Sequence, residues 1–301
     1  MFFITSQQNY DKIHIEKNEN NKTYQGEKNM DKSQEIQSFE KSLKKTNLSK
    51  NTISAYCHAV AQFFDSHNEI NKKNLLAHKG FLLENYQPKT TNLRILAINK
   101  YLEFCGKSKM KIKLVRIQQK TFLENVISDA DYKFFKNKLK KDKKNNWYFV
   151  VRYLAATGAR VSELVQIKVE HIFIGYLDIY SKGGKVRRIY IPKALRDETI
   201  KWLEQTNTKT GYLFLNRFGK KLTTRGVAQQ LKAFATEYGM NPKVVYPHSF
   251  RHRFAKNFLE KYNDIALLAD LMGHESIQTT RIYLRKTSNE QQEIVDKIIT
   301  W

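Results

Sequence analysis

The chain has 301 residues, of which 53 are Lys or Arg and 29 are Asp or Glu, so its formal net charge is +24. Two cysteines, Cys57 and Cys105, exclude a disulfide framework, and no apolar stretch reaches the ~18 residues that cross a bilayer. With 41% hydrophobic residues the chain can build packed cores, and its length predicts two domains. We therefore expect a soluble cytoplasmic protein whose basic surface binds a polyanion, nucleic acid rather than a membrane.

The positive charge is shared between both expected folded parts. Residues 1–32 carry balanced charges and are rich in Asn and Gln, which predicts a disordered tail, with Met30 as an alternative start. Residues 31–116 carry a net charge of +9 and residues 117–301 carry +15. A single basic patch is often only a solvated face, whereas an excess in two successive domains favours a clamp around duplex DNA.

Residues 33–106 predict a small bundle of about four helices, because apolar residues recur there at spacings of three and four. Ser49 and Thr90 are the expected N-caps of two of these helices. The expected helix breakers are Gly80, Pro88 and Gly106. The Lys-rich segment 107–120 has no helical pattern and predicts a basic interdomain linker.

Residues 121–301 predict a second, mostly helical domain that contains one β-hairpin. Ser128 is placed to begin its first helix, and two short strands within 176–192 flank a Gly-Gly turn. Further helices are expected over 147–156, 194–205, 224–238, 249–261, 265–273 and 276–284. A last amphipathic stretch carries Ile294, Val295, Ile298, Ile299 and Trp301. The fold class is therefore mainly α with a small β-hairpin.

Two segments in the first half of this domain could bind an anion. In Ala-Thr-Gly-Ala-Arg-Val-Ser-Glu-Leu, a glycine loop ends and a helix begins at Arg160, which suits an arginine that faces an anion. The hairpin projects Lys182 beside its Gly-Gly turn. Each of these signals is weak alone, since a surface arginine in a turn and a solvated lysine are the commoner interpretations.

Two further segments lie closer to the C-terminus. Pro-His-Ser-Phe-Arg-His places His248 and Arg251 three residues apart at a helix start, on one face. Leu-Met-Gly-His ends at His274, and Tyr283 follows nine residues later. Metal binding explains these histidines poorly, because no acidic or cysteine ligands accompany them at ligand spacing. A cationic set around a tyrosine instead suits phosphoryl transfer without a metal or another cofactor.

With these four segments the chain resembles the tyrosine recombinase family, the phage integrases and Xer proteins, over residues 33–301. The segment 156–164 looks like the family's first arginine box, 247–252 like its His-x-x-Arg box, and 271–274 with Tyr283 like its final box. The resemblance implies that 33–106 is a SAM-like core-binding domain for DNA and 121–301 the catalytic domain. It also implies strand cleavage and rejoining through a 3′-phosphotyrosyl intermediate.

The resemblance assigns a role to each candidate residue. Arg160 and Arg251 would bind the scissile phosphate, and Tyr283 would be the nucleophile. Lys182 would be the general acid, with Lys185 as the runner-up. The assisting residues would be His248 as base, His274 as phosphate donor and Glu163 as a support of the site.

In this family the C-terminal segment docks on a neighbouring subunit, which implies a homotetramer, or a heterotetramer with a related recombinase, on two DNA sites. Packing of the apolar face of residues 294–299 within its own chain is equally open. Chromosome-dimer resolution, integration or excision, and inversion all fit as biological roles. A type IB topoisomerase and a catalytically silent DNA-binding protein remain the alternative classes.

Overall fold

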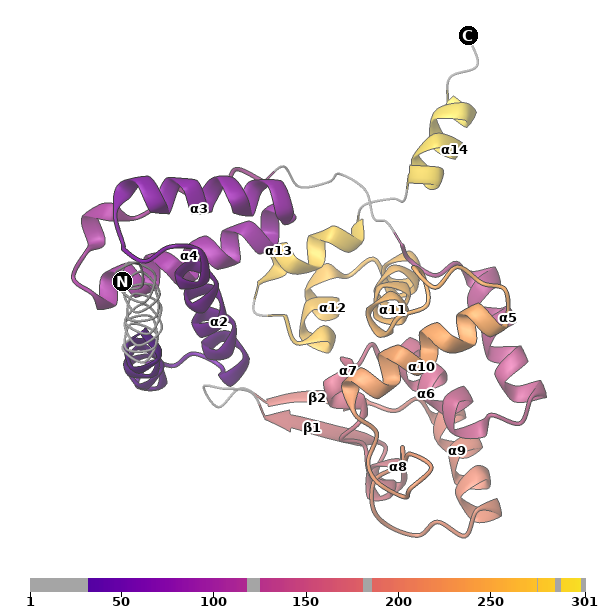
Figure 1. The fold of residues 1–301 in the computed structure, drawn as a ribbon. Coiled ribbons are helices and arrows are strands. Elements are labelled where there is room, and N and C mark those ends of the chain that lie inside the picture. Colours follow the sequence, from indigo (N-terminus) through magenta and orange to yellow (C-terminus); the bar gives the residue numbers. More distant parts are fainter. Residues whose placement is uncertain (1–31, 118–124, 181–185, 275, 285–287, 299–301) are drawn as a thin grey trace, which may run out of the picture. The chain divides into compact units, whose positions relative to one another are not determined.

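A computed structural model describes residues 32–117, 125–180, 186–274, 276–284 and 288–298 of the chain (Figure 1). The chain divides into two compact units, Met1–Gln119 and Lys120–Trp301, and each has its own hydrophobic core. Within the described ranges no helix is both long and apolar enough to cross a membrane. The expected tail, up to residue 31, and the hairpin turn at 181–185 lie outside the described residues.

The first unit is a bundle of four helices, as the apolar spacing predicts. A helix over residues 32–44 precedes α2 (Lys50–Ser66), α3 (Lys72–Asn85) and α4 (Pro88–Phe104). Ser49 caps α2, because its side chain accepts a hydrogen bond from the Thr52 N–H. The core gathers the inward faces of these helices, including Phe63, Leu82, Ile98 and Leu102.

Two expected helix boundaries in this unit are wrong. Thr90 does not cap α4, which begins at Pro88 after Gln87. Proline suits the first helical position because it lacks the N–H that would be unpaired there. Gly80 does not break α3 but lies within it, where a Cβ would meet nothing within 4 Å. A glycine on an open helix surface costs only about 1 kcal/mol relative to alanine, so the helix continues through it.

Much of the segment expected as a linker packs on the first unit. A 3₁₀ turn, η1 (Ser108–Met110), is followed by Ile112, which is buried in the core of the bundle. The Ile112 N–H donates to Asn99 at 2.8 Å, and the Val115 N–H donates to Asn92 at 2.8 Å. Both asparagines lie on α4, so the backbone up to Val115 is held by this helix.

The second unit is mainly helical and contains one two-stranded sheet. Ser128 caps α5 (Asp129–Lys141) as predicted, because its side chain accepts from the Asp131 N–H at 3.0 Å. The buried helix α6 (Asn145–Thr157) packs against α5, α9 (Lys193–Gln205) and α11 (Pro247–Tyr262) and forms the centre of the core. The six-residue helix α8 is absent from the sequence prediction. The described helices are α5 (Asp129–Lys141), α6 (Asn145–Thr157), α7 (Val161–Leu164), α8 (Val169–Ile174), α9 (Lys193–Gln205), α10 (Thr224–Glu237), α11 (Pro247–Tyr262), α12 (Ile265–Met272), α13 (Ile277–Thr280), η2 (Arg281–Leu284) and α14 (Ser288–Ile298).

The predicted strands pair antiparallel as β1 (Tyr176–Tyr180) and β2 (Val186–Tyr190). Ile179 pairs with Arg187, and side chains alternate across the sheet, so Arg187 shares the inward face with the buried Ile189. An arginine on the inward face of this hairpin was not anticipated from the sequence.

Helix α14 carries part of the apolar stretch expected at the C-terminus. Val295 and Ile298 are exposed on it. The side chain of Ile294, together with Ile299 and Trp301, lies outside the described residues. The two described apolar side chains of this stretch are therefore not buried in the chain.

Candidate active site

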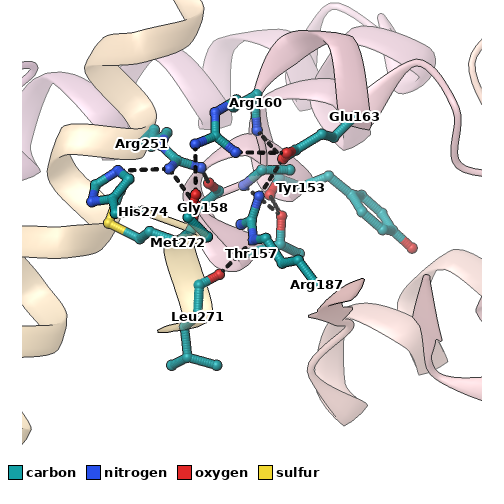
Figure 2. Close-up of polar contacts among 12 residues, drawn as sticks. Tyr153, Thr157, Gly158, Arg160, Glu163, Arg187, Arg251, Leu271, Met272 and His274 are labelled. Carbon is teal, nitrogen blue, oxygen red and sulfur yellow. Dashed lines mark hydrogen bonds and ion pairs between the residues drawn. The ribbon is translucent and has the colours of Figure 1, made fainter. Parts of the chain in front are cut away.

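Three arginines from distant parts of the second unit meet at the C-terminal end of α12 (Figure 2). Arg160 precedes α7, Arg187 lies on β2 and Arg251 lies in α11. Each donates to one of three successive backbone carbonyls, which lack helical partners at a helix end and carry its partial negative charge. The pairs are Arg187 Nε with Leu271 O at 2.8 Å, Arg251 Nη2 with Met272 O at 2.7 Å, and Arg160 Nη2 with Gly273 O at 3.0 Å.

The glycine of the first arginine box positions Arg251. Helix α6 ends at Gly158, whose φ is +60°, and the Gly158 carbonyl accepts from Arg251 Nη1 at 2.5 Å. A Cβ at this position would lie 2.4 Å from Cδ1 of Phe254, so a glycine is required by both conformation and space. Arg251 is only 2% exposed, and burial together with the charges of Arg160 and Arg187 lowers its pKa to about 10.

Glu163 is the acidic counterpart of this cluster and is itself buried. Its Oε1 accepts from Arg160 Nη1 at 2.8 Å, and its Oε2 accepts from the Arg160 backbone N–H at 2.7 Å and from Arg187 Nη1 at 2.5 Å. Burial acts to raise the pKa of Glu163, but Arg187 and the hydrogen bonds from Arg160 outweigh it and lower the pKa. The carboxylate therefore stays ionised, and the cluster holds three guanidinium groups but one carboxylate, which pairs with Arg160 and Arg187. This excess of positive charge suits an anion.

Tyr283 lies beside this cluster in η2 and is 6% exposed. Its ring lies 6.2 Å from the ring of His274, nearly parallel at 16°, and 5.3 Å from the ring of His252. Burial raises the pKa of the Tyr283 phenol, whereas the nearby Arg251 and Arg160 act to lower it. Burial outweighs the arginines, so the pKa of the phenol stays raised, and the neighbouring cations only reduce the cost of ionising it.

The ring of His274 is fixed on both sides. Its Nε2 lies 3.0 Å from Arg251 Nη2, and its Nδ1 lies 2.7 Å from Thr280 Oγ1. Burial and the charge of Arg251 lower the pKa of His274 to about 4, so the imidazole is neutral at neutral pH. Because an arginine can only donate, Nε2 must be the acceptor and Nδ1 must carry the proton that goes to Thr280.

The remaining predicted residues differ in how far the structure places them. His248 is exposed in the first turn of α11, and its ring lies 6.2 Å from that of His252, one turn further along. Although part of the side chain reaches solvent, partial desolvation by the surrounding site and the charges of Arg251 and Arg160 lower the pKa of His248. Lys182 and Lys185 lie outside the described residues. The described predicted residues that meet at one place are Arg160, Glu163, Arg251, His274 and Tyr283.

Two residues of the site were not predicted. Arg187 looks like an exposed strand residue unless its register is known, and the one available signal was that it is two residues from the apolar Ile189. His252 ends the His-x-x-Arg segment and contacts the Tyr283 ring. Burial lowers the pKa of His252 to about 4, so it too is neutral.

Known proteins resemble this chain in sequence and in fold. Residues 124–290 match the model of the phage integrase family. Tyrosine recombinase XerA of Pyrococcus furiosus is 30% identical over 273 residues, which cover 88% of this chain and 94% of XerA. Tyrosine recombinase XerD of Listeria monocytogenes is 34% identical over 154 residues, 48% of this chain and 52% of XerD. The fold matches a crystal structure of a lambda integrase dimer bound to a COC′ core site with a TM-score of 0.68, at 14% identity, covering 83% of this chain and 76% of that one. The chain therefore belongs to the phage integrase family and is a tyrosine recombinase, an enzyme of site-specific DNA recombination.

Proposed function

We propose that Tyr283 is the nucleophile of this recombinase and that Arg160 and Arg251 hold the scissile phosphate. The observation that carries the proposal is a buried phenol beside a cluster of three guanidinium groups, of which Arg160 and Arg187 pair with the one carboxylate, that of Glu163, and Arg251 does not. A phosphodiester supplies the missing negative charge. As attack proceeds, charge grows on the phosphoryl oxygens, and preorganised guanidinium donors stabilise that charge.

In the proposed step the Tyr283 oxygen forms a bond to phosphorus, and the bond from phosphorus to the 5′-oxygen breaks. The products are a 3′-phosphotyrosyl linkage and a free 5′-hydroxyl. His248 accepts the phenol proton, which is consistent with its lowered pKa, because a neutral imidazole can take up a proton. Lys182 delivers a proton to the leaving 5′-oxygen. Since the linkage keeps the phosphodiester energy, the reverse reaction joins a partner strand without a cofactor.

His274 is suited to respond to the phosphate. In the free protein its Nε2 accepts from Arg251 and has no proton to give. A bound phosphate brings negative charge, which raises the pKa of a neighbouring imidazole. Protonated His274 would then donate from Nε2 to a phosphoryl oxygen, while Thr280 continues to hold Nδ1.

The two units take complementary roles in this proposal. The basic first unit acts as the core-binding domain and the second unit as the catalytic domain, and both contact duplex DNA. The exposed Val295 and Ile298 of α14 fit docking on a neighbouring subunit, as in a homotetramer or a heterotetramer with a related recombinase on two DNA sites. Dimer resolution, integration or excision, and inversion each use this one chemistry.

The experiment begins by finding a target. A pool of random duplexes is selected for binding to the Tyr283→Phe chain, which cannot become trapped covalently. A series of nicked duplexes then carries the selected sequence with the nick at successive positions, so that the short 5′-hydroxyl fragment released by cleavage diffuses away. Covalent adducts are read on a denaturing gel.

Wild type and the control Tyr262→Phe should give the adduct, and Tyr283→Phe should not. Tyr262 is a matched control because it is an exposed tyrosine at the end of α11. An adduct from Tyr283→Phe would refute the assignment of the nucleophile. Binding by wild type without any adduct would identify a silent DNA-binding protein. Relaxation of a supercoiled plasmid that lacks the selected sequence would favour a topoisomerase.

A further inference from the structure

Arg187 is a buried arginine to which the proposed reaction assigns no step. It lies on the inward face of β2 and is 7% exposed. Burial acts to lower its pKa, and Glu163 acts to raise it. A buried guanidinium is costly unless partners compensate it, so its contacts indicate what it is placed to do.

Three contacts fix this side chain between two parts of the site. Nη1 donates to Glu163 Oε2 at 2.5 Å, and Nε donates to the Leu271 carbonyl at 2.8 Å. The third contact is with Gly273, whose φ is +60° and where an added Cβ would lie 2.3 Å from Cδ of Arg187. The turn that leads into His274 thus packs directly on the Arg187 side chain.

These contacts close a ring. Glu163 binds both Arg187 and Arg160, and Arg160 reaches the Gly273 carbonyl, two residues beyond the Leu271 carbonyl that Arg187 holds (Figure 2). In a closed ring of hydrogen bonds no member can turn without breaking a contact of its neighbours. The direction of the Arg160 guanidinium is therefore set in part by Arg187, which does not touch it through a hydrogen bond.

We propose that Arg187 is a positioning residue for strand cleavage, which holds Glu163 and the Leu271–Gly273 turn so that Arg160 and His274 face the scissile phosphate. This role rests on the proposed function of Arg160 and His274. Without Arg187, Glu163 Oε2 loses its side-chain partner. The planar fork of Arg160 matches a carboxylate with two parallel hydrogen bonds, so Arg160 turns toward Glu163 and away from the phosphate.

The chain offers a matched control on the same strand. Arg188 is the next residue, lies on the opposite, exposed face and pairs with Asp178 through Nε at 2.8 Å and Nη2 at 2.9 Å. Arg188→Met therefore removes the same group and the same charge without touching the ring of contacts. Arg187→Lys keeps the charge at position 187, but one ammonium replaces the fork that holds two partners.

The test measures single-turnover cleavage of the selected nicked duplex at saturating protein. Affinity for the intact duplex is measured in the Tyr283→Phe background, and folding is followed by thermal melting. We expect Arg187→Met to cleave on the order of a hundredfold more slowly, as for a misplacement of about 1 Å in an active site, with an unchanged Kd. Arg187→Lys should fall between it and wild type, and Arg188→Met should cleave at the wild-type rate.

A double-mutant cycle with Glu163→Gln identifies the route of the effect. If Arg187 acts through Glu163, Arg187→Met slows the Glu163→Gln chain much less than it slows wild type. Cleavage by Arg187→Met or Arg187→Lys at the wild-type rate overturns the proposal. The proposal is also overturned if the variants cleave more slowly only in proportion to their loss of folded protein and of affinity for the duplex. If Arg187→Met does not fold, Arg187→Lys decides alone. Failure of wild type to form an adduct would instead refute the proposed function.

Discussion

Replacing Gly158 by alanine should destabilise the second unit more than a conformational effect alone can explain. Gly158 ends α6 with φ at +60°, a region that costs a residue with a Cβ about 1–2 kcal/mol. The new Cβ would also lie 2.4 Å from Cδ1 and 2.8 Å from Cε1 of Phe254. Forcing an extra methyl into a packed site adds about 1–3 kcal/mol, which gives a total of about 2–5 kcal/mol.

Gly239 provides the control for the conformational part. Its φ is +68°, and a Cβ there would meet nothing within 4 Å, so Gly239→Ala should cost only about 1–2 kcal/mol. The free energy of unfolding is measured by guanidinium chloride denaturation followed by tryptophan fluorescence. The three tryptophans, Trp147, Trp202 and Trp301, all belong to the second unit, so the signal reports on that unit.

The difference between the two variants isolates the overlap with Phe254 and should be about 1–3 kcal/mol. Equal destabilisation by both substitutions would refute the reasoning, because it would mean that the ring moves aside at no cost. Cleavage is a second measurement. The Gly158 carbonyl accepts from Arg251, so the Gly158→Ala chain should also cleave more slowly at temperatures where it is folded, whereas Gly239→Ala should not.

Three further predictions concern single buried polar residues. Thr280→Val removes the hydroxyl that lies 2.7 Å from His274 Nδ1. Cleavage should slow about tenfold at unchanged affinity for the duplex. An unchanged cleavage rate would show that the His274 imidazole does not need this hydrogen bond. The buried Ile127 N–H donates to Ser249 Oγ at 2.7 Å, and Ser249→Ala removes this acceptor. The free energy of unfolding, measured by denaturant titration, should fall by about 1–3 kcal/mol. An unchanged value would show that another acceptor takes over. In the first unit, burial lowers the pKa of His78 to about 4. Below pH 6.5 the unfolded chain therefore takes up a proton that the folded unit does not. The free energy of unfolding falls as the pH drops from 6.5 to 4. His78→Phe should abolish this loss, worth about 3 kcal/mol at pH 4, in calorimetric scans; an acid dependence equal to that of wild type would contradict it.

Apolar spacing and capping residues predict a helix well where no neighbouring residue, such as a proline, changes its boundary. The apolar spacing gives the four helices of the first unit, and Ser49 and Ser128 mark helix starts because their side chains accept backbone N–H groups. Thr90 misleads because a proline two residues earlier sets the start of α4. Helix α8, at six residues, is shorter than two turns and leaves too little periodicity to detect.

The site contains residues that local sequence patterns predict and others, such as Arg187, that they do not. The three boxes identify Arg160, Arg251 and Tyr283 from their own segments, and these do meet in space. Arg187 belongs to no box, and its importance depends on strand register, on Glu163 and on a backbone carbonyl 84 residues further along the chain. Backbone carbonyls carry no mark in a sequence, so a site that is organised around the end of a helix cannot be read from residue types.

The gathering of three arginines on one helix end also ties the proposed active site to the folding of the whole second unit. Two of the three bonds to the helix end span 84 and 113 residues of chain, and the bond from Arg251 to the Gly158 carbonyl spans 93. Contacts of such separation form late because a long loop must close first. A chain whose second unit has opened therefore has its arginines and tyrosine scattered, so the site that we propose for strand cleavage exists only while that unit is folded.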